Sequence, residues 1–210
     1  MSLAYGVSAV VPVKDLQGTK SRLAPILNPG ARAGLTLYMM GRVVAAIRSS
    51  GVEDVCVVSP DRIVLNEAQR RGAIPLAQES RGLNPALEEG RRRALELGAS
   101  TLLVLPADLP LLGEEDVLAV LKASEGQAVV IAPDGARSGT NALLTRPPDA
   151  LPFAFGPDSF EAHLEAARKL GLAVRVCERS HLAFDLDTAG DLARLKKSGL
   201  GSRTSECASL

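Results

Sequence analysis

The sequence predicts an α/β fold in which helices cover both faces of a mostly parallel central sheet. Short runs rich in Val, Leu and Ile alternate with longer amphipathic runs along the chain. Several short runs are apolar at nearly every position, as is typical of strands buried on both faces. A length of 210 residues fits one such domain. We therefore expect one domain over residues 1–198 and a disordered polar tail over residues 199–210.

The elements follow one another in a regular order. Residues 7–13 are unbroken by charge, residues 101–106 are almost pure Leu and Val, and Pro157 suits the first position of a helix. The expected strands are residues 7–13, 54–59, 73–77, 101–106, 127–132 and 172–177, with a further apolar segment at 141–144. The expected helices are residues 31–50, 61–72, 83–98, 114–122, 157–170 and 188–197.

Composition argues against several classes of function. The 24 basic and 24 acidic residues cancel and only 3% of residues are aromatic, so no nucleic-acid partner is expected. No apolar stretch is long enough for a membrane span and the N-terminus is not signal-like, which favours a cytoplasmic protein. Cys56, Cys177 and Cys207 lack C-x-x-C spacing and are interpreted as reduced thiols. The two histidines, His163 and His181, are too few for a His-rich zinc site.

The loop after the first strand carries three cations, Lys14, Lys20 and Arg22. Ligands of open α/β sheets bind beyond the carboxyl ends of the strands. Ammonium and guanidinium groups suit a triphosphate, so we expect these three side chains to clamp one and thereby act in catalysis. A merely solvated loop is the alternative. The loop matches neither G-x-x-x-x-G-K-[ST] nor G-x-G-x-x-G, which argues against a P-loop enzyme and a dinucleotide oxidoreductase.

Three carboxylates follow apolar segments and are candidate metal ligands. Asp108 lies between two prolines after the strand at 101–106, where burial of a charge requires a partner. Asp185 and Asp187 are two residues apart and share a face if that segment is extended. Their mutual repulsion favours a bound Mg²⁺ or Mn²⁺. The alternative is that Asp108 or Asp187 caps the helix that follows it.

Two further loops are candidate binding sites. Gly156 precedes an expected helix whose free N–H groups, with the hydroxyl of Ser159, form a natural anion site, and Thr140 in a nearby loop is expected to contact the same anion. An ordinary helix start is the alternative. Gly82 permits close backbone approach, and Asn84 can bind the edge of a base, with helix capping as its alternative. His163 and Cys56 are interpreted as packing residues.

Together and in this order, these loops resemble one family. The motifs are Pro12-Val-Lys14 with Lys20-Ser-Arg22-Leu23, Gly82-Leu-Asn84, Pro106-Ala-Asp108-Leu-Pro110, Gly139-Thr140-Asn141-Ala-Leu, Phe155-Gly156-Pro157-Asp158-Ser159-Phe160 with His163, and Asp185-Leu-Asp187-Thr188. They resemble those of the guanylyltransferases of coenzyme F-420 biosynthesis, the CofC/FbiD family, which is related to the molybdenum-cofactor guanylyltransferases. The resemblance covers residues 7–197.

The resemblance implies a nucleotide-diphospho-sugar transferase-like (Rossmann-like) domain that transfers GMP from GTP to phosphoenolpyruvate or 2-phospho-L-lactate, or in some members 3-phosphoglycerate. Pyrophosphate is released, and the product passes to the next enzyme of the deazaflavin pathway. It implies the following roles: Thr140, Gly156 and Ser159 hold the acid, Asp108, Asp185 and Asp187 hold Mg²⁺, and Lys14, Lys20 and Arg22 surround the triphosphate.

Two alternatives stay open at this point. A molybdopterin guanylyltransferase would have a glycine-rich first loop, which this chain lacks. A non-catalytic nucleotide-binding domain would bind GTP without turnover. The sequence does not choose between phosphoenolpyruvate and 2-phospho-L-lactate, which differ in saturation at one carbon, and it leaves the oligomeric state open, a homodimer included.

Overall fold

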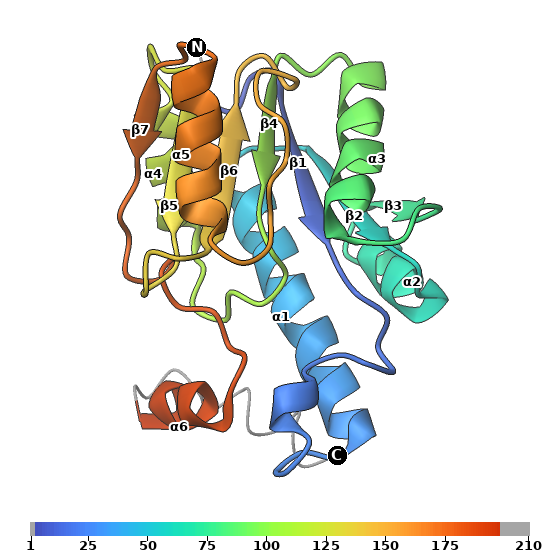
Figure 1. The fold of residues 1–210 in the computed structure, drawn as a ribbon. Helices are drawn as coiled ribbons and strands as arrows, with labels where there is room; N and C mark the ends of the chain where they lie inside the picture. The colour runs from blue at the N-terminus through green and yellow to red at the C-terminus, as the bar shows by residue number, and fades with distance from the viewer. Residues whose placement is uncertain (1–2, 198–210) are drawn as a thin grey trace.

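The computed structural model describes residues 3–197, in which seven strands form one sheet (Figure 1). The strands are β1 (Val7–Pro12), β2 (Asp54–Ser59), β3 (Ile74–Ala77), β4 (Thr101–Val104), β5 (Val129–Pro133), β6 (Thr140–Thr145) and β7 (Val174–Val176). Their order across the sheet is β3-β2-β1-β4-β6-β5-β7. The pairs β1–β2, β1–β4, β2–β3 and β5–β7 are parallel, which confirms the prediction of a mostly parallel sheet.

Strand β6, expected only as an apolar segment, runs antiparallel to both of its neighbours, β4 and β5. The residues between β5 and β6 form a short loop closed by Asp134, whose Oδ1 accepts the Ser138 N–H at 2.8 Å. A short loop joins antiparallel strands, whereas parallel neighbours need a longer crossover. Because β6 is reversed, its first residue, Thr140, lies at the same sheet edge as the carboxyl end of β4.

Helices cover both faces of the sheet, as predicted (Figure 1). They are α1 (Pro29–Ser49), α2 (Arg62–Arg70), α3 (Leu83–Glu96), α4 (Glu114–Ala123), α5 (Ser159–Lys169) and α6 (Ala189–Lys197), with a 3-10 helix η1 (Ser21–Leu23). Alternate residues of β1 face opposite ways: Ala9 and Val11 join the core under α1, α2 and α4, and Val10 joins the core under α3 and α5.

Several element ends differ from the sequence prediction. Helix α1 begins at Pro29 instead of residue 31, because Asn28 caps it by accepting the Ala31 N–H at 2.8 Å. Helix α5 begins at Ser159 instead of residue 157, because Asp158 has a left-handed backbone with φ of 54°. Strand β4 ends at Val104, and Pro106 has no N–H to extend the ladder. The expected tail at 199–210 and the domain boundary at 198 lie outside the described residues.

A third, smaller apolar cluster lies beyond the sheet edge and joins α6 to α1 and η1. Its members are Leu23, Leu35, Met39, Leu186, Leu192 and Leu195. Leu23 follows Lys20 closely and Leu186 separates Asp185 from Asp187, so this cluster fixes the cationic loop beside the acidic segment. Within residues 3–197, no helix is both long and apolar enough to span a membrane.

Candidate active site

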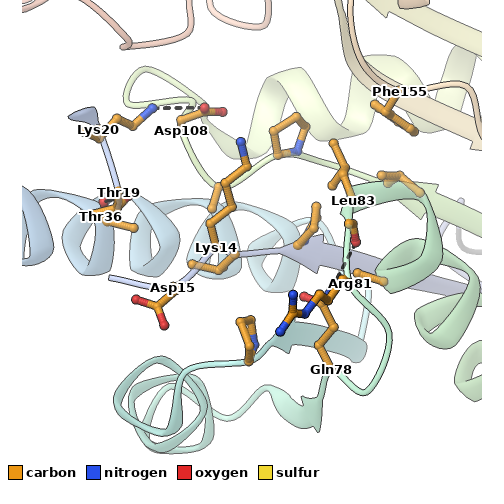
Figure 2. Close-up of a pocket in the computed structure, with 18 of the residues that line it drawn as sticks. Lys14, Asp15, Thr19, Lys20, Thr36, Gln78, Arg81, Leu83, Asp108 and Phe155 are labelled. Carbon is orange, nitrogen blue, oxygen red and sulfur yellow. Dashed lines mark hydrogen bonds and ion pairs between the residues drawn. The ribbon is translucent and has the colours of Figure 1, made fainter. Parts of the chain in front are cut away.

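A cavity of about 700 Å³ opens at the carboxyl ends of the parallel strands (Figure 2). Its wall is formed by the loop after β1 (Lys14 to Lys20), the loop after β3 (Gln78 to Leu83) and the loop after β4 (Pro106 to Asp108). Phe155, from the segment before α5, closes one side. The cavity therefore lies where an open α/β sheet binds its ligands.

Lys14 extends from the loop after β1 into this cavity (Figure 2). It is exposed, and no group among residues 3–197 forms an ion pair or hydrogen bond with its Nζ. An unpaired ammonium in a concave site is suited to an anionic ligand. The predicted placement of Lys14 at a nucleotide is compatible with this geometry.

Lys20 has a different environment. Its side chain is only 7% exposed, and its Nζ lies 3.0 Å from Asp108 Oδ2 and 2.8 Å from Asp187 Oδ1. Burial alone would lower the pKa of Lys20, but the two carboxylates outweigh burial and raise the pKa above its ordinary value of 10.5. Arg22 extends into solvent, with 74% of its side chain exposed and NH1 3.9 Å from Asp187 Oδ2. Of the three predicted cations, Lys14 and Lys20 line the cavity and Arg22 lies outside it.

The three predicted metal ligands are brought together. The Leu186 N–H donates to the Asp108 carbonyl at 3.0 Å, which places the segment of Asp185 and Asp187 beside the loop of Asp108. Burial raises the pKa of Asp185 above its ordinary value of 3.8, and the charges of Asp108 and Asp187 raise it further. A bond from Asn141 Nδ2, 3.5 Å from Asp185 Oδ1, acts in the opposite direction. Negative charge is therefore concentrated here.

The acidic site is only partly arranged for a cation. Among residues 3–197, no three or more His, Cys, Asp and Glu side chains are placed to share a metal ion. The ammonium of Lys20 instead lies between Asp108 and Asp187. The donor set still fits Mg²⁺, because carboxylate oxygens are its preferred ligands and the raised pKa of Asp185 indicates that one ammonium does not balance three carboxylates.

Neither Asp108 nor Asp187 caps a helix, which was the alternative for both. The N-cap of α4 is Gly113, whose N–H donates to Asp116 Oδ2 at 3.1 Å. Before α6, the Thr188 hydroxyl accepts the Asp191 N–H at 3.2 Å, and Asp191 Oδ2 accepts the Thr188 N–H at 2.8 Å. Asp108 and Asp187 direct their carboxylates to Lys20 instead.

The loop at 78–82 is held in shape by Glu89 of α3, a residue that the sequence analysis did not select. Glu89 accepts the N–H groups of Glu79 at 3.0 Å and Ser80 at 2.8 Å. Burial alone would raise the pKa of Glu89, but these two donors hold it below its ordinary value. Gly82 lines the cavity with φ of +106°, a conformation that favours glycine.

Asn84 uses its amide on the protein backbone. Its Oδ1 accepts the Phe155 N–H at 2.9 Å, and its Nδ2 donates to the Phe155 carbonyl at 3.0 Å. It does not cap α3, whose N-cap is Gly82. Asn84 thus joins α3 to the segment that carries Phe155, and its binding of a base stays a prediction.

The predicted acid-binding residues form a second group at the start of β6. Ser159 Oγ accepts the Thr140 N–H at 3.0 Å, and the Ser159 N–H donates to the Gly156 carbonyl at 3.3 Å. The prediction of a free first turn from Gly156 to Ser159 is wrong, because α5 starts at Ser159 and the Phe160 N–H donates to the Ser138 carbonyl at 3.1 Å. The space next to Gly156 is open, because no atom lies within 4 Å of a Cβ built there.

His163, interpreted from the sequence as a packing residue, is the second functional candidate that was missed. It is fully buried and touches Thr140 through Nδ1 at 3.0 Å. Its ring packs edge-on against Phe155, with ring centroids 4.9 Å apart. The motif that carried the resemblance included His163, and this was the one signal available for it.

Comparison with known proteins gives consistent matches over the whole described chain. The protein family described as guanylyl transferase, CofC like, matches residues 7–208. A phosphoenolpyruvate guanylyltransferase of Rubrobacter xylanophilus is 63% identical over 194 residues, covering 92% of this chain and 95% of that protein. A 2-phospho-L-lactate guanylyltransferase of Methanothermobacter thermautotrophicus is 37% identical over 202 residues, covering 94% and 87%.

Solved structures support the same fold. A candidate nucleotide-diphospho-sugar transferase from Desulfovibrio desulfuricans superposes with a TM-score of 0.75 at 17% identity, covering 94% of this chain and 89% of that one. A CMP:2-keto-3-deoxy-manno-octonic acid synthetase complexed with CTP gives a TM-score of 0.63 at 15% identity, covering 92% and 98%.

Proposed function

Because the chain belongs to the family of CofC-like guanylyl transferases, we propose that it transfers the guanylyl group of GTP to the phosphate of phosphoenolpyruvate. The 63% identity to a phosphoenolpyruvate guanylyltransferase favours this acceptor over 2-phospho-L-lactate, the substrate named for the relative at 37%. The resemblance of its motifs supports a place for the product in coenzyme F-420 biosynthesis in the cytoplasm.

GTP would occupy the cavity beyond β1 and β4. The observation that supports this most is the position of Lys14, an unpaired ammonium that extends into the cavity. The loop at 78–82, held by Glu89, would surround the guanine, and the triphosphate would lie between Lys14 and Asp108. Lys20 and Arg22, near Asp187, would support the phosphates from the other side.

Asp108, Asp185 and Asp187 would hold Mg²⁺ when the nucleotide is bound. The ion would neutralise phosphate oxygens and fix their position. Lys20 would then exchange its two carboxylates for a phosphate oxygen, an exchange that its neighbouring position allows. The carboxylates would thus be paired with a cation in both states.

Thr140, Ser159 and the backbone around Gly156 would hold the three-carbon acid beside the nucleotide. A phosphate oxygen of the acid attacks the α-phosphorus of GTP, the bond from that phosphorus to the bridging oxygen of the β-phosphate breaks, and pyrophosphate leaves with the electron pair. The nucleophile is already an anion, so no side chain has to remove a proton. The residues contribute by positioning two anions and neutralising their charge.

The test is an incubation of the protein with Mg²⁺, labelled GTP and each of phosphoenolpyruvate, 2-phospho-L-lactate and 3-phosphoglycerate. Pyrophosphate release and a guanylated acid should appear with phosphoenolpyruvate and require both substrates. GTP binding without pyrophosphate release in any mixture would support a non-catalytic nucleotide-binding domain and contradict the proposal.

A further inference from the structure

His163 is the most completely buried ionisable residue near the proposed acid site. It lies one helical turn after Ser159 on α5, so both side chains point to the start of β6. Its Nε2 accepts the Ala154 N–H at 3.0 Å, and its Nδ1 lies 3.0 Å from Thr140 Oγ1. Both ring nitrogens therefore have partners.

These two contacts determine which ring nitrogen carries the proton. A backbone N–H can only donate, so Nε2 must offer its lone pair to Ala154. A neutral imidazole then has its single proton on Nδ1. Burial lowers the pKa of His163 to about 4, against a contact with the Ser159 backbone that acts in the opposite direction. The ring is therefore neutral near pH 7, with the proton on Nδ1.

A protonated Nδ1 has no lone pair, so the Thr140 hydroxyl cannot donate to His163 and accepts from it instead. Ser159 is in the same situation, because its hydroxyl accepts the Thr140 N–H. Within residues 3–197, neither hydroxyl has an acceptor for its own proton. Two neighbouring hydroxyl protons without acceptors are suited to an anion.

We propose that His163 is a positioning residue that makes Thr140 a hydrogen-bond donor to the carboxylate or phosphate of the acid substrate. This inference rests on the proposed placement of the acid at Thr140. The ring also joins the two substrate sites, because it packs edge-on against Phe155, which lines the nucleotide cavity. His163 itself does not touch substrate.

A matched pair of variants separates this role from simple packing. His163→Asn places an amide nitrogen near the position of Nδ1 and keeps a donor to Thr140, but it loses the acceptor for Ala154. His163→Gln reaches the position of Nε2 and keeps the acceptor for Ala154, but it loses the donor to Thr140. Both variants lose ring volume and one hydrogen bond, so their thermal stabilities should fall by similar amounts.

The assay measures KM for phosphoenolpyruvate and for GTP on both variants and on Thr140→Val. Thr140→Val and His163→Gln should raise KM for the acid about ten-fold, with KM for GTP unchanged. His163→Asn should leave KM for the acid within about two-fold of the wild type. Equal KM values for the acid in the two His163 variants would overturn the inference. An unchanged KM in Thr140→Val would overturn the acid site itself and the inference with it.

A measurement on the unmodified chain covers the case in which either histidine variant fails to fold. In protein labelled with ¹⁵N-histidine, the ring nitrogen shifts report the tautomer, and His181, which is half-exposed, serves as the internal comparison. His163 should show a protonated Nδ1 and an unprotonated Nε2 from pH 6 to 8. A proton on Nε2, or on both nitrogens, would overturn the inference.

Discussion

Replacing Lys20 by Met should destabilise the protein, and Mg²⁺ should reverse much of the loss. The change removes a buried ammonium from between Asp108 and Asp187, whose side chains are 33% and 42% exposed. Breaking a fully buried pair costs about 3–5 kcal/mol, and exposed pairs contribute about 0–1 kcal/mol. With one buried partner and two partly exposed ones, we expect a loss of about 2 kcal/mol, or roughly 4–8 °C in melting temperature for a chain of this size.

The response to Mg²⁺ gives the sharper test. A divalent cation at 100 times its Kd stabilises a folded protein by about 2.7 kcal/mol. In Lys20→Met the cation enters an unpaired acidic site, whereas in the wild type it must displace the ammonium. Added Mg²⁺ should therefore raise the melting temperature of the variant more than that of the wild type.

Lys14→Met is the matched control, since Lys14 is a lysine in the same cavity without a partner among residues 3–197. Its melting temperature should stay close to that of the wild type, while its KM for GTP should rise. Thermal unfolding followed by circular dichroism, with and without Mg²⁺, measures both variants. Equal stability of Lys20→Met and wild type, or an equal gain from Mg²⁺, would refute the reasoning.

Four other changes test single assignments. Asp187→Asn should abolish turnover in Mg²⁺ with the fold retained by circular dichroism; activity within a few-fold of the wild type would contradict a metal role. The pKa of Asp185 is raised above 3.8, so its contribution to stability is present at lower pH and lost as pH rises through the raised pKa; Asp185→Asn should therefore increase the metal-free melting temperature at pH 7 while reducing turnover. Arg22→Ala, on a mostly exposed side chain, should raise KM for GTP by no more than a few-fold in steady-state assays. Gly156→Ala should raise KM for the acid and lower stability by about 1–3 kcal/mol, because φ of +141° strains alanine although space is free.

The order of elements and the edge that carries the site could be predicted because both depend on local pattern. Strand β2 and the start of α3 were placed to the residue, since the apolar runs and Gly82 mark them directly. The direction of β6 could not be predicted, because a short apolar run does not specify its pairing partner.

Pairings between distant residues were outside the reach of local patterns. Lys20 contacts carboxylates 88 and 167 residues away, so the sequence indicated a cation and acids without indicating that they neutralise one another. An Asn near a helix start can bind a base, a cap or a distant backbone equally well, and only the fold assigns Asn84 to Phe155. The role of His163 depends on the Ala154 N–H, and alanine gives no side-chain signal.

The reversal of β6 bears on how acceptors can be told apart. Phosphoenolpyruvate is planar at the carbon that carries the phosphate, and 2-phospho-L-lactate is tetrahedral there, while both present the same charged groups. Donors on a mobile loop would adjust to either shape. Thr140 belongs to a strand with neighbours on both sides, and its N–H is bonded to Ser159. A donor held in this way measures the outline of its ligand, so acceptor choice in this chain becomes a question of stereochemistry at one carbon.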